Sequence, residues 1–389
     1  MHPKISKSPS KPQPTKPIAI LGMMSGTSVD GIDGAVVISD GVSVERTGCT
    51  KKHEWHPKTR SRIFTTMEEM QASSSPASLL GRAEYTALAQ TIAEEHVHLA
   101  KHLITRYGKP IKLIGFHGQT ILHRPAERLS LQLGDAKTLA QATGIKTVHN
   151  FRQNDLALGG EGAPLAPIYH AELARLDGLA PPLAIANIGG VANVTLCMDD
   201  SVDDTGTLLA FDTGPGNGMM DRLMQQQRQL PFDKDGEVAA SGTPDQGYIN
   251  AVLDNPWFAT PPPKSLDRFA SEAMLLPQRL ASLPLADALA SLAEITAISL
   301  TRALSFAPIP PTTLLISGGG VHNRHLCGRI AHHAPCPLTS LATYGIDPGF
   351  VEAELIAFLA VRCLADLPIT FPTTTGVATP QSGGVVVAP

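Results

Sequence analysis

The chain has 389 residues, of which 43% are hydrophobic and 17% are charged, and its formal net charge is −4. This composition predicts a soluble globular protein, and the length predicts two domains of ordinary size. The weakly acidic balance argues against a broad nucleic-acid or anionic-membrane surface, so any anion must be bound locally.

Residues 1–17 are rich in Lys, Pro and Ser and offer little to bury, which predicts a disordered tail. The apolar run at 18–24 is shorter than a membrane span, and polar residues follow it directly where a signal peptide would have its cleavage site. The five cysteines are scattered without a C-x-x-C pair, which indicates reduced thiols. We therefore expect a cytoplasmic protein with no membrane partner.

The next part of the chain alternates strand and helix patterns. The expected strands lie at 17–24, 34–39, 43–49, 111–118, 129–135 and 145–150. A long helical stretch covers about 76–107 after a Ser-rich cap, and a short helix separates the last two strands. These elements predict an α/β fold, with a first lobe over residues 18–155.

The pattern then begins again at the scale of a whole lobe. Expected elements are a strand pair around Gly-Gly at 183–196, a strand at 207–218, helices over about 219–306 and a strand, turn and helix start at 313–323. This weak duplication predicts a second lobe over residues 156–365, with residues 366–389 completing the first. Two such lobes suggest a nucleotide held between them, where closure expels water during phosphoryl transfer.

Residues 20–38, ILGMMSGTSVDGIDGAVVI, place two apolar runs around a centre of small, hydroxylic and acidic residues. Glycines let backbone N–H groups approach a ligand, hydroxyls can donate to an anion, and Asp30 could hold the hydration shell of a cation. This centre predicts a phosphate-binding hairpin, with a plain polar turn as the alternative. The P-loop and Rossmann motifs are missing from the chain.

Ordered motifs extend from about residue 18 to the C-terminus. They are GMMSGTSVDGIDGA, GFHGQT, LQLGDA, NFRQNDLALGGEGAPLAP, NIGGVANVT, FDTGPGNGMMD, PPPKS, ISGGGVHN and TTGVATP. The chain thereby resembles the anhydro-N-acetylmuramic acid kinases. This resemblance implies the two-lobed, ribonuclease H-like fold of actin, sugar kinases and heat-shock ATPases. It also implies that ATP phosphorylates O6 of 1,6-anhydro-N-acetylmuramic acid while water opens the anhydro bridge, giving N-acetylmuramic acid 6-phosphate and ADP in cell-wall sugar recycling.

The resemblance also implies which residues bind ATP and Mg²⁺. The expected ATP-binding residues are Gly26, Thr27, Ser28, Val29, Asp30, Gly31, Ile32 and Asp33 in the first hairpin, Gly189 and Gly190 in the second, and Gly318, Gly319, Gly320 and Asn323 at a helix start. Asp30 is expected to face Mg²⁺ through water. The alternatives are an ordinary hairpin turn at 189–190 and an ordinary strand-to-helix turn at 318–323.

Asp212, at the end of a strand, is the expected catalytic base, because water attacking the anomeric carbon must lose a proton. An aspartate at this place could instead cap a helix or turn. Arg152 is the candidate for the lactyl carboxylate of the sugar, with a structural ion pair to Asp155 or another carboxylate as its alternative. Glu352, which matches a family glutamate thought to face the sugar, could instead serve only the dipole of its helix.

His117 and Gln119 leave the strand at 111–118 and are expected to bond sugar hydroxyls, although a buried structural histidine is the alternative for His117. Glu161 stands where the family commonly has Gln, and Leu266-Asp267-Arg268 replaces its usual Thr-Gly-Arg. An anion near an anionic sugar removes a donor and adds repulsion. A kinase for another sugar or a carboxylate, and a non-catalytic ATP sensor, therefore remain alternatives. A homodimer is expected from the resemblance.

Overall fold

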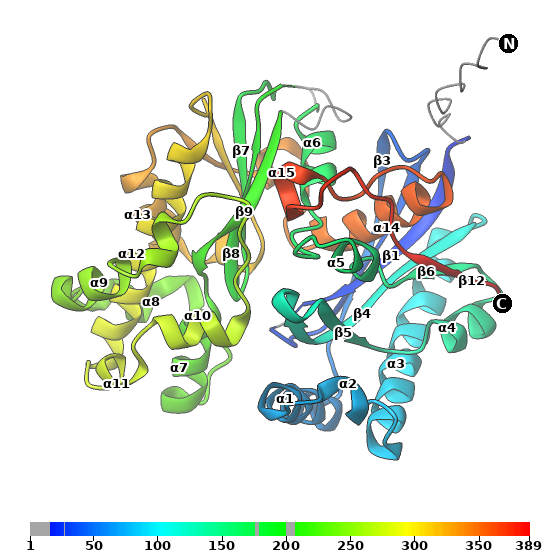
Figure 1. The fold of residues 1–389 in the computed structure, drawn as a ribbon, viewed down its shortest axis with the longest axis horizontal. Coiled ribbons are helices and arrows are strands. Elements are labelled where there is room, and N and C mark those ends of the chain that lie inside the picture. Colours follow the sequence, from blue (N-terminus) through cyan, green and yellow to red (C-terminus); the bar gives the residue numbers. More distant parts are fainter. Residues whose placement is uncertain (1–15, 27, 176–178, 200–206) are drawn as a thin grey trace, which may run out of the picture.

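The computed structural model describes residues 16–26, 28–175, 179–199 and 207–389, which form two α/β lobes side by side (Figure 1). Each lobe is built on one mixed sheet. The strands of the first sheet are β1 Ile18–Ser25, β2 Ile32–Ser39, β3 Val44–His53, β4 Leu113–Arg124, β5 Leu129–Leu133, β6 Thr147–His149 and β12 Val385–Val387. Those of the second are β7 Leu183–Ile188, β8 Val191–Cys197, β9 Leu208–Pro215, β10 Leu314–Ser317 and β11 Leu338–Ser340. The tail expected at 1–17 lies outside the described residues except for its last two.

The two sheets repeat one strand order. The first runs β12-β6-β4-β1-β2-β3, with β5 paired to β4, and the second runs β11-β10-β7-β8-β9. In each, three antiparallel strands follow one another along the chain, a later strand (β4 or β10) pairs parallel with the first of the three, and a further strand (β6 or β11) pairs parallel with that one. This shared order confirms the two-lobed ribonuclease H-like fold and explains the duplication visible in the sequence.

Helices cover the sheets. The longer ones are α1 Pro57–Ala72, α3 Ala83–Tyr107, α4 Ala136–Thr143, α7 Gly218–Arg228, α9 Gln246–Leu253, α12 Leu285–Ala303, α13 Arg324–His333 and α14 Val351–Leu364. The shorter ones are α2 Pro76–Leu79, α5 Gln153–Ala157, α6 Pro167–Leu173, α8 Glu237–Ser241, α10 Arg268–Met274, α11 Pro277–Leu280 and α15 Pro372–Thr375. Short 3₁₀ turns are η1 Pro125–Glu127, η2 Lys234–Gly236, η3 Pro256–Ala259, η4 Leu304–Phe306, η5 Gly319–His322 and η6 Leu341–Tyr344.

The core between the two sheets is formed around α14. This helix is buried along most of its length and packs on β1, β2 and β4 of the first sheet. Its close approach depends on Gly22 and Gly115, because a Cβ at either position would collide with the carbonyl oxygen of Ala353 or Ile356. The same apolar cluster includes Ile185 of the second sheet. The lobes therefore share a continuous core on the side that α14 occupies.

The packing of α14 bears on the lobe boundary. The boundary expected after residue 365 leaves α14 in the second lobe, whereas α14 lies on the first sheet. Further along the chain, β12 pairs antiparallel with β6 at the edge of that sheet. We therefore propose that the C-terminal part completing the first lobe begins at α14.

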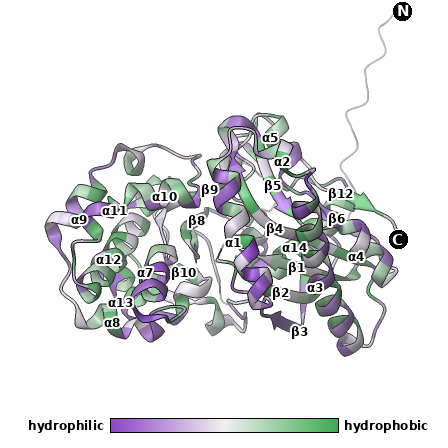
Figure 2. Ribbon diagram, turned by 90° about the horizontal axis from the view of Figure 1, so that it is seen from below, coloured by the Kyte–Doolittle hydropathy of each residue, from purple (hydrophilic) through white to green (hydrophobic). Residues whose placement is uncertain are grey.

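The outer faces carry amphipathic helices. In the first lobe, α1 and α3 cover the sheet face opposite α14, and Figure 2 shows both hydrophilic and hydrophobic colours along them. The expected helix at 76–107 is interrupted at residues 80–82, and α1 was not predicted. In the second lobe, α12 with η4 is the one stretch of the described residues long and apolar enough to cross a membrane, but most of it is buried against the sheet and its neighbours.

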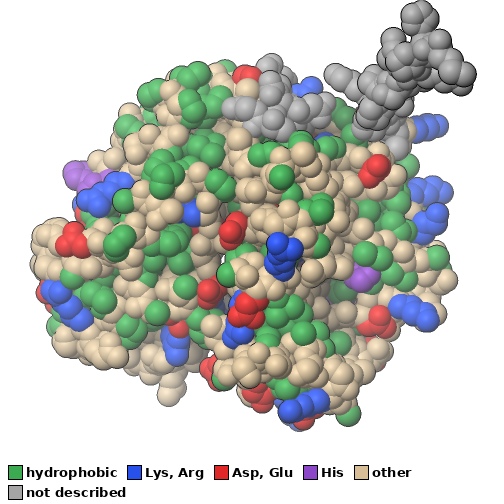
Figure 3. Space-filling view, viewed as in Figure 1, with side chains coloured by type: hydrophobic (Ala, Val, Ile, Leu, Met, Phe, Trp, Pro, Cys, Tyr) green, Lys and Arg blue, Asp and Glu red, His purple; other side chains and the backbone are tan. Residues whose placement is uncertain are grey.

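The surface carries charges of both signs. On the face drawn in Figure 3, Lys and Arg side chains are interspersed with Asp and Glu side chains, including along the boundary between the lobes. Neighbouring charges of opposite sign oppose each other's potential, and mobile ions screen what remains beyond roughly 8 Å at physiological ionic strength. This face therefore presents no extended field of a single sign.

Candidate active site

The first predicted hairpin joins β1 to β2 and is braced by Gln119 of β4. Gln119 is fully buried, and its Nε2 donates to the carbonyl oxygens of Gly26 at 3.1 Å and Thr120 at 3.0 Å. Its Oε1 lies 2.6 Å from Ser25 Oγ, which is 2.9 Å from the carbonyl oxygen of Gly31. The polar atoms of Gln119 are thus used by the hairpin, which differs from the expected contact with the sugar.

Asp30 lies at the tip of this hairpin and is half-exposed. Its Oδ1 accepts a 2.7 Å hydrogen bond from Ser28 Oγ, and its Oδ2 forms an ion pair with Lys52 of β3. Burial opposes ionisation, but Lys52 outweighs it and lowers the pKa of Asp30. Val29, which separates Ser28 from Asp30 in the chain, has a left-handed backbone, with φ of 53°. Thr27 lies outside the described residues.

Two further carboxyls face Asp30. Asp33 on β2 stands opposite Lys52 in the strand register, and Asp221 lies in the first turn of α7 in the other lobe. Burial raises the pKa of each to about 7, and the negative charge of Asp30 adds to both shifts. The charge of Asp30 therefore acts on carboxyl groups of both lobes. Within the described residues no group of three or more His, Cys, Asp or Glu side chains lies close enough together to hold a metal ion, so these carboxyls fit Mg²⁺ only with water between them and the ion.

The second predicted hairpin, Gly189-Gly190 between β7 and β8, is clamped by the loop after β9. The N–H groups of Gly216 and Gly218 donate to the carbonyl oxygen of Gly190 at 3.1 and 3.3 Å, and that of Asn217 donates to Gly189 at 2.8 Å. Helix α7 begins at Gly218. The hairpin and the helix N-terminus, which favours anions, are therefore fixed beside each other.

The turn after β10 contains the third predicted group of glycines. Gly318 has φ of 79°, and a Cβ there would collide with Oδ1 of Asn187. A Cβ on Gly319 would meet no protein atom within 4 Å, so this backbone lies open. Asn323 caps α13, since its Oδ1 accepts a 2.9 Å hydrogen bond from the Leu326 N–H. Gly319 is thus available to a nucleotide, whereas Gly320 is buried against Ile188 and the side-chain oxygen of Asn323 is used within the protein.

Asp212 lies near the end of β9 and is only 9% exposed. Its backbone N–H donates to the carbonyl oxygen of Lys264 at 3.0 Å, and its Oδ2 accepts a 2.6 Å hydrogen bond from the Leu266 N–H. Burial raises the pKa of Asp212 to about 7. The Leu266 hydrogen bond and the positive charges of Arg152 and Lys264 lower this pKa, whereas the negative charge of Glu161 raises it further. Asp212 is thus a carboxyl that changes charge near neutral pH.

Lys264 belongs to the PPPKS motif and lies in the loop beside Asp212. Its Nζ donates to the carbonyl oxygens of Trp257 and Phe258, both at 3.1 Å, and lies 4.3 Å from the centre of the Trp257 ring. Burial lowers its pKa to about 8. The lysine side chain therefore anchors the loop whose backbone holds Asp212, and the aromatic face supports its charge.

Arg152 precedes α5 and is oriented by His117. Arg152 Nε donates to His117 Nε2 at 3.2 Å, while His117 Nδ1 lies 3.1 Å from the carbonyl oxygen of Gly118. These partners require a neutral imidazole, and burial together with the Arg152 charge lowers the pKa of His117 to about 3. His117 thus fixes the arginine, as a buried histidine whose ring is already used.

The expected alternative for Arg152, an ion pair with Asp155, is not among the ion pairs of the described residues. Asp155 instead accepts hydrogen bonds from the Gly162 N–H and the Thr375 hydroxyl, both at 2.7 Å. Arg152 Nη1 donates to the carbonyl oxygen of Gly162 at 2.7 Å. Burial lowers the pKa of Arg152 to about 10, against the charges of Glu352 and Asp212. This arginine can therefore still receive an anionic ligand.

Glu352 lies in the first turn of α14. Its Oε1 accepts a 3.3 Å hydrogen bond from Asn187 Nδ2. Burial raises its pKa, the positive charge of Arg152 opposes this, and Asp30 adds to it. The negative charge of Asp212 also acts on Arg152, so Glu352, Arg152 and Asp212 share one electrostatic environment. Arg152, Glu352 and Asp212, predicted for the sugar, and Asp30, predicted for the phosphates, are thus linked through their charges.

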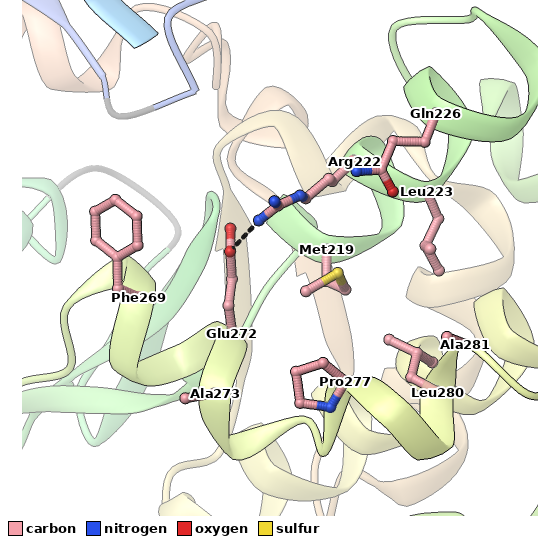
Figure 4. A pocket seen from close by; sticks show the side chains of 10 residues that line it. All are labelled: Met219, Arg222, Leu223, Gln226, Phe269, Glu272, Ala273, Pro277, Leu280 and Ala281. Atoms are coloured by element: carbon pink, nitrogen blue, oxygen red, sulfur yellow. Dashed lines mark hydrogen bonds and ion pairs between the residues drawn. The ribbon is translucent and has the colours of Figure 1, made fainter. Parts of the chain in front are cut away.

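A cavity of about 390 Å³ lies elsewhere in the second lobe, between α7, α10 and α11 (Figure 4). Arg222 and Glu272 form an ion pair beside it, over a lining that includes Met219 and Leu280 (Figure 4). None of the predicted site residues lines this cavity. This cavity is therefore not the candidate active site, which is formed by the polar side chains described above.

Sequence reasoning missed three residues of the site. Lys52 lay in a strand with no motif, Asp221 was the last letter of FDTGPGNGMMD, and Lys264 was in PPPKS. A signal existed for the last two, because both stand in the motifs that carry the resemblance. Their contacts, however, depend on which strands and loops face each other.

Comparison with known proteins agrees with these motifs. The model of the family described as "Anhydro-N-acetylmuramic acid kinase" matches residues 18–389. Curated proteins of that name from Methylobacterium nodulans and Caulobacter vibrioides are 40% and 41% identical to this chain. The alignments cover 95% of this chain in both cases, and 99% and 98% of those proteins.

Solved structures with a similar arrangement were also found. One is the activator of the 2-hydroxyisocaproyl-CoA dehydratase from Clostridium difficile with bound ADPNP, with a TM-score of 0.44, 11% identity and coverage of 88% of this chain and 94% of that one. Another is a ROK family glucokinase from Streptomyces griseus in complex with glucose and AMPPNP, with a TM-score of 0.42, 12% identity and coverage of 88% and 99%.

Proposed function

The chain belongs to the anhydro-N-acetylmuramic acid kinase family, and we propose that Asp212 is the general base of its reaction. The enzyme is a kinase that phosphorylates O6 of 1,6-anhydro-N-acetylmuramic acid and hydrolyses its anhydro bridge. The observation that carries the proposal is the buried Asp212 carboxyl, fixed by the Leu266 N–H and facing Arg152. An alternative acceptor is not favoured by the relatives.

The reaction requires two coupled displacements. A water oxygen bonds to the anomeric carbon as the bond from that carbon to O6 breaks, and the water proton passes to Asp212. The freed O6 bonds to the transferred phosphorus as the bond to the leaving ADP oxygen breaks. ATP supplies the phosphoryl group, and Mg²⁺ neutralises charge on the phosphates. The protein contributes mainly by positioning these groups and stabilising charge.

Asp212 suits the role of base because of its environment. A general base works best when its pKa lies near the operating pH, and burial raises the pKa of Asp212 to about 7. Oδ2 is held by Leu266, and Oδ1 accepts no hydrogen bond among the described residues. That second oxygen is therefore the one we assign to the water.

Arg152 is proposed to bind the lactyl carboxylate of the sugar, because its planar fork of donors suits a carboxylate. Its orientation by His117 supports this role. Glu352 is proposed to face the sugar near the reacting groups. For His117 and Gln119, whose bonds are made within the protein, we propose support of Arg152 and of the first hairpin in place of direct contact with sugar hydroxyls.

The two hairpins and the open turn after β10 are proposed to bind Mg²⁺·ATP. Backbone groups of the first hairpin and of Gly189-Gly190 would hold the phosphates, and the open backbone of Gly319 would receive the adenosine. Asp30 would hold Mg²⁺ through water, and its charge also acts on Asp33 and Asp221. We also propose that the enzyme acts in the cytoplasm as a homodimer, which a sedimentation measurement would test.

The experiment that tests the proposal uses the Asp212→Asn variant. With ATP, Mg²⁺ and the anhydro sugar, the wild type should give a product heavier by one water and one phosphoryl group. The variant should still bind ATP but should form this product far more slowly. Unchanged turnover in the variant would remove Asp212 from the mechanism.

A further inference from the structure

Asp212 and Arg152 are connected through two neighbouring loops. One loop follows α5 and contains Gly160, Glu161 and Gly162; the other precedes α10 and contains Ser265 and Leu266. Resting on the proposed function of Asp212, we propose that the hydrogen bond between Glu161 and Ser265 is a positioning tie, which fixes the base relative to the arginine that receives the sugar carboxylate.

The loop after α5 is a rigid support, because each of its three N–H groups is bonded. Gly160 donates to the carbonyl oxygen of Asp155 at 2.9 Å, and Glu161 donates to that of Thr375 at 2.7 Å. Gly162 donates to Oδ2 of Asp155 at 2.7 Å. A Cβ on Gly160 would collide with the Asp155 carboxylate. The Glu161 side chain therefore starts from a fixed backbone.

This loop is also attached to the arginine. The carbonyl oxygen of Gly162 accepts a 2.7 Å hydrogen bond from Arg152 Nη1, one residue after Glu161. His117 holds the Nε side of the same guanidinium at 3.2 Å. Any movement of the 160–162 loop would therefore move a partner of Arg152.

The second loop is attached to the base. Ser265 Oγ donates a 2.7 Å hydrogen bond to Oε2 of Glu161. The residues on either side of Ser265 hold Asp212: the Lys264 carbonyl accepts its N–H at 3.0 Å, and the Leu266 N–H donates to its Oδ2 at 2.6 Å. The Glu161–Ser265 bond thus completes a path from Arg152 to Asp212.

The bond also explains how an anion is accommodated at position 161. One carboxylate oxygen of Glu161 receives the Ser265 hydroxyl, which partly satisfies the charge. The charged groups that act on Asp212 are Arg152 beside α5, Glu161 in the loop after it, and Lys264 in the loop before α10. Glu161 is the negative one among them, so it both positions the base and favours its protonated form.

Three variants separate these effects. Ser265→Ala removes the bond and keeps the charge, Glu161→Gln keeps an acceptor for the hydroxyl and removes the charge, and Glu161→Ala removes both. Loss of one hydrogen bond predicts that Ser265→Ala lowers kcat about 2- to 10-fold, with the KM for ATP and the unfolding temperature little changed. Glu161→Gln should lower kcat less than Glu161→Ala does, and it should shift the acid limb of the kcat/KM profile to lower pH.

Matched controls are Ser282→Ala, which removes an exposed hydroxyl bonded to the Arg279 carbonyl, and Glu127→Gln on the surface. Both should behave as the wild type. The inference is overturned if Ser265→Ala keeps the wild-type kcat. It is also overturned if kcat falls as far in Glu161→Gln as in Glu161→Ala and the acid limb of the kcat/KM profile stays at the same pH. If Asp212→Asn retains full turnover, the proposed role of Asp212 fails and this inference fails with it. If Asp212→Asn is inactive while Ser265→Ala keeps the wild-type kcat, only this inference fails.

Discussion

The backbone N–H of Leu266 donates a 2.6 Å hydrogen bond to Oδ2 of the buried Asp212 carboxyl. A side-chain donor could rotate away, but this donor belongs to a loop that Lys264 anchors through the carbonyl oxygens of Trp257 and Phe258. Oδ2 of the carboxyl is therefore held by the loop, and Oδ1 is the oxygen that we assign to the attacking water.

Replacing the base should abolish turnover without abolishing nucleotide binding. General base catalysis contributes about 10²- to 10⁴-fold, so Asp212→Asn is expected to lower kcat by at least two orders of magnitude. Steady-state kinetics and calorimetric titration with ATP measure the two effects. Asp254→Asn, at an exposed position, is the control and should retain wild-type kinetics.

The pH profile should show the ionisation of Asp212. A base must be deprotonated to accept a proton, and burial raises the pKa of this carboxyl to about 7. The kcat/KM for the anhydro sugar is therefore expected to rise with pH through an acid limb near 7. An acid limb near the ordinary value of 3.8 would contradict the assignment.

The same carboxyl should make the protein's stability depend on pH. It ionises near 3.8 in the unfolded chain and at about 7 in the folded protein, so the folded state holds the proton more tightly. The stability contributed by the protonated group is complete below pH 3.8 and is lost as the pH rises through 7. The unfolding temperature of Asp212→Asn minus that of the wild type should therefore increase from about pH 5 to about pH 8. A constant difference would oppose this.

Arg152 should discriminate sugars by their carboxylate. One charge-assisted hydrogen bond contributes about 1.5–3 kcal/mol, so Arg152→Lys is expected to lower kcat/KM for the anhydro-muramic sugar about 10- to 100-fold. Its effect on 1,6-anhydro-N-acetylglucosamine, which lacks the lactyl group, should be much smaller. Equal losses on the two sugars would assign Arg152 a structural role; Arg82→Lys, at an exposed position, is the control.

Two adjacent glycines should respond differently to alanine. Gly318 has φ of 79° and no room for a Cβ, so Gly318→Ala should lower the free energy of unfolding by more than about 1 kcal/mol. Gly319 has open space, so Gly319→Ala should fold normally and raise the KM for ATP. Thermal unfolding and kinetics at varied ATP give both answers. An unchanged KM for ATP in Gly319→Ala would exclude this turn from the nucleotide site.

The sequence predicted the two-lobed fold because the strand patterns are strongly apolar and recur around Gly-rich turns in both halves. It did not predict α1, and it joined α2 to α3, because the helical pattern alone does not show the interruption at residues 80–82. The position of α14 on the first sheet depends on contacts with Gly22 and Gly115, which are distant in the sequence.

For the site, the motifs identified the residues better than their contacts. Asp212 and Arg152 stand in quoted motifs, and the structure brings them into one electrostatic environment. The use of Gln119 by the first hairpin could not be predicted, because it requires β4 to pair beside β1 in a particular register. The bond between Glu161 and Ser265 likewise joins two loops about a hundred residues apart, and no local pattern indicates it.

The most direct test of the central claim is product analysis by mass spectrometry after incubating the wild type and Asp212→Asn with ATP, Mg²⁺ and 1,6-anhydro-N-acetylmuramic acid. We predict that the wild type forms a product heavier by one water and one phosphoryl group, and that the variant binds ATP but forms almost none. Equal product from both proteins would contradict the assignment of Asp212 as the base.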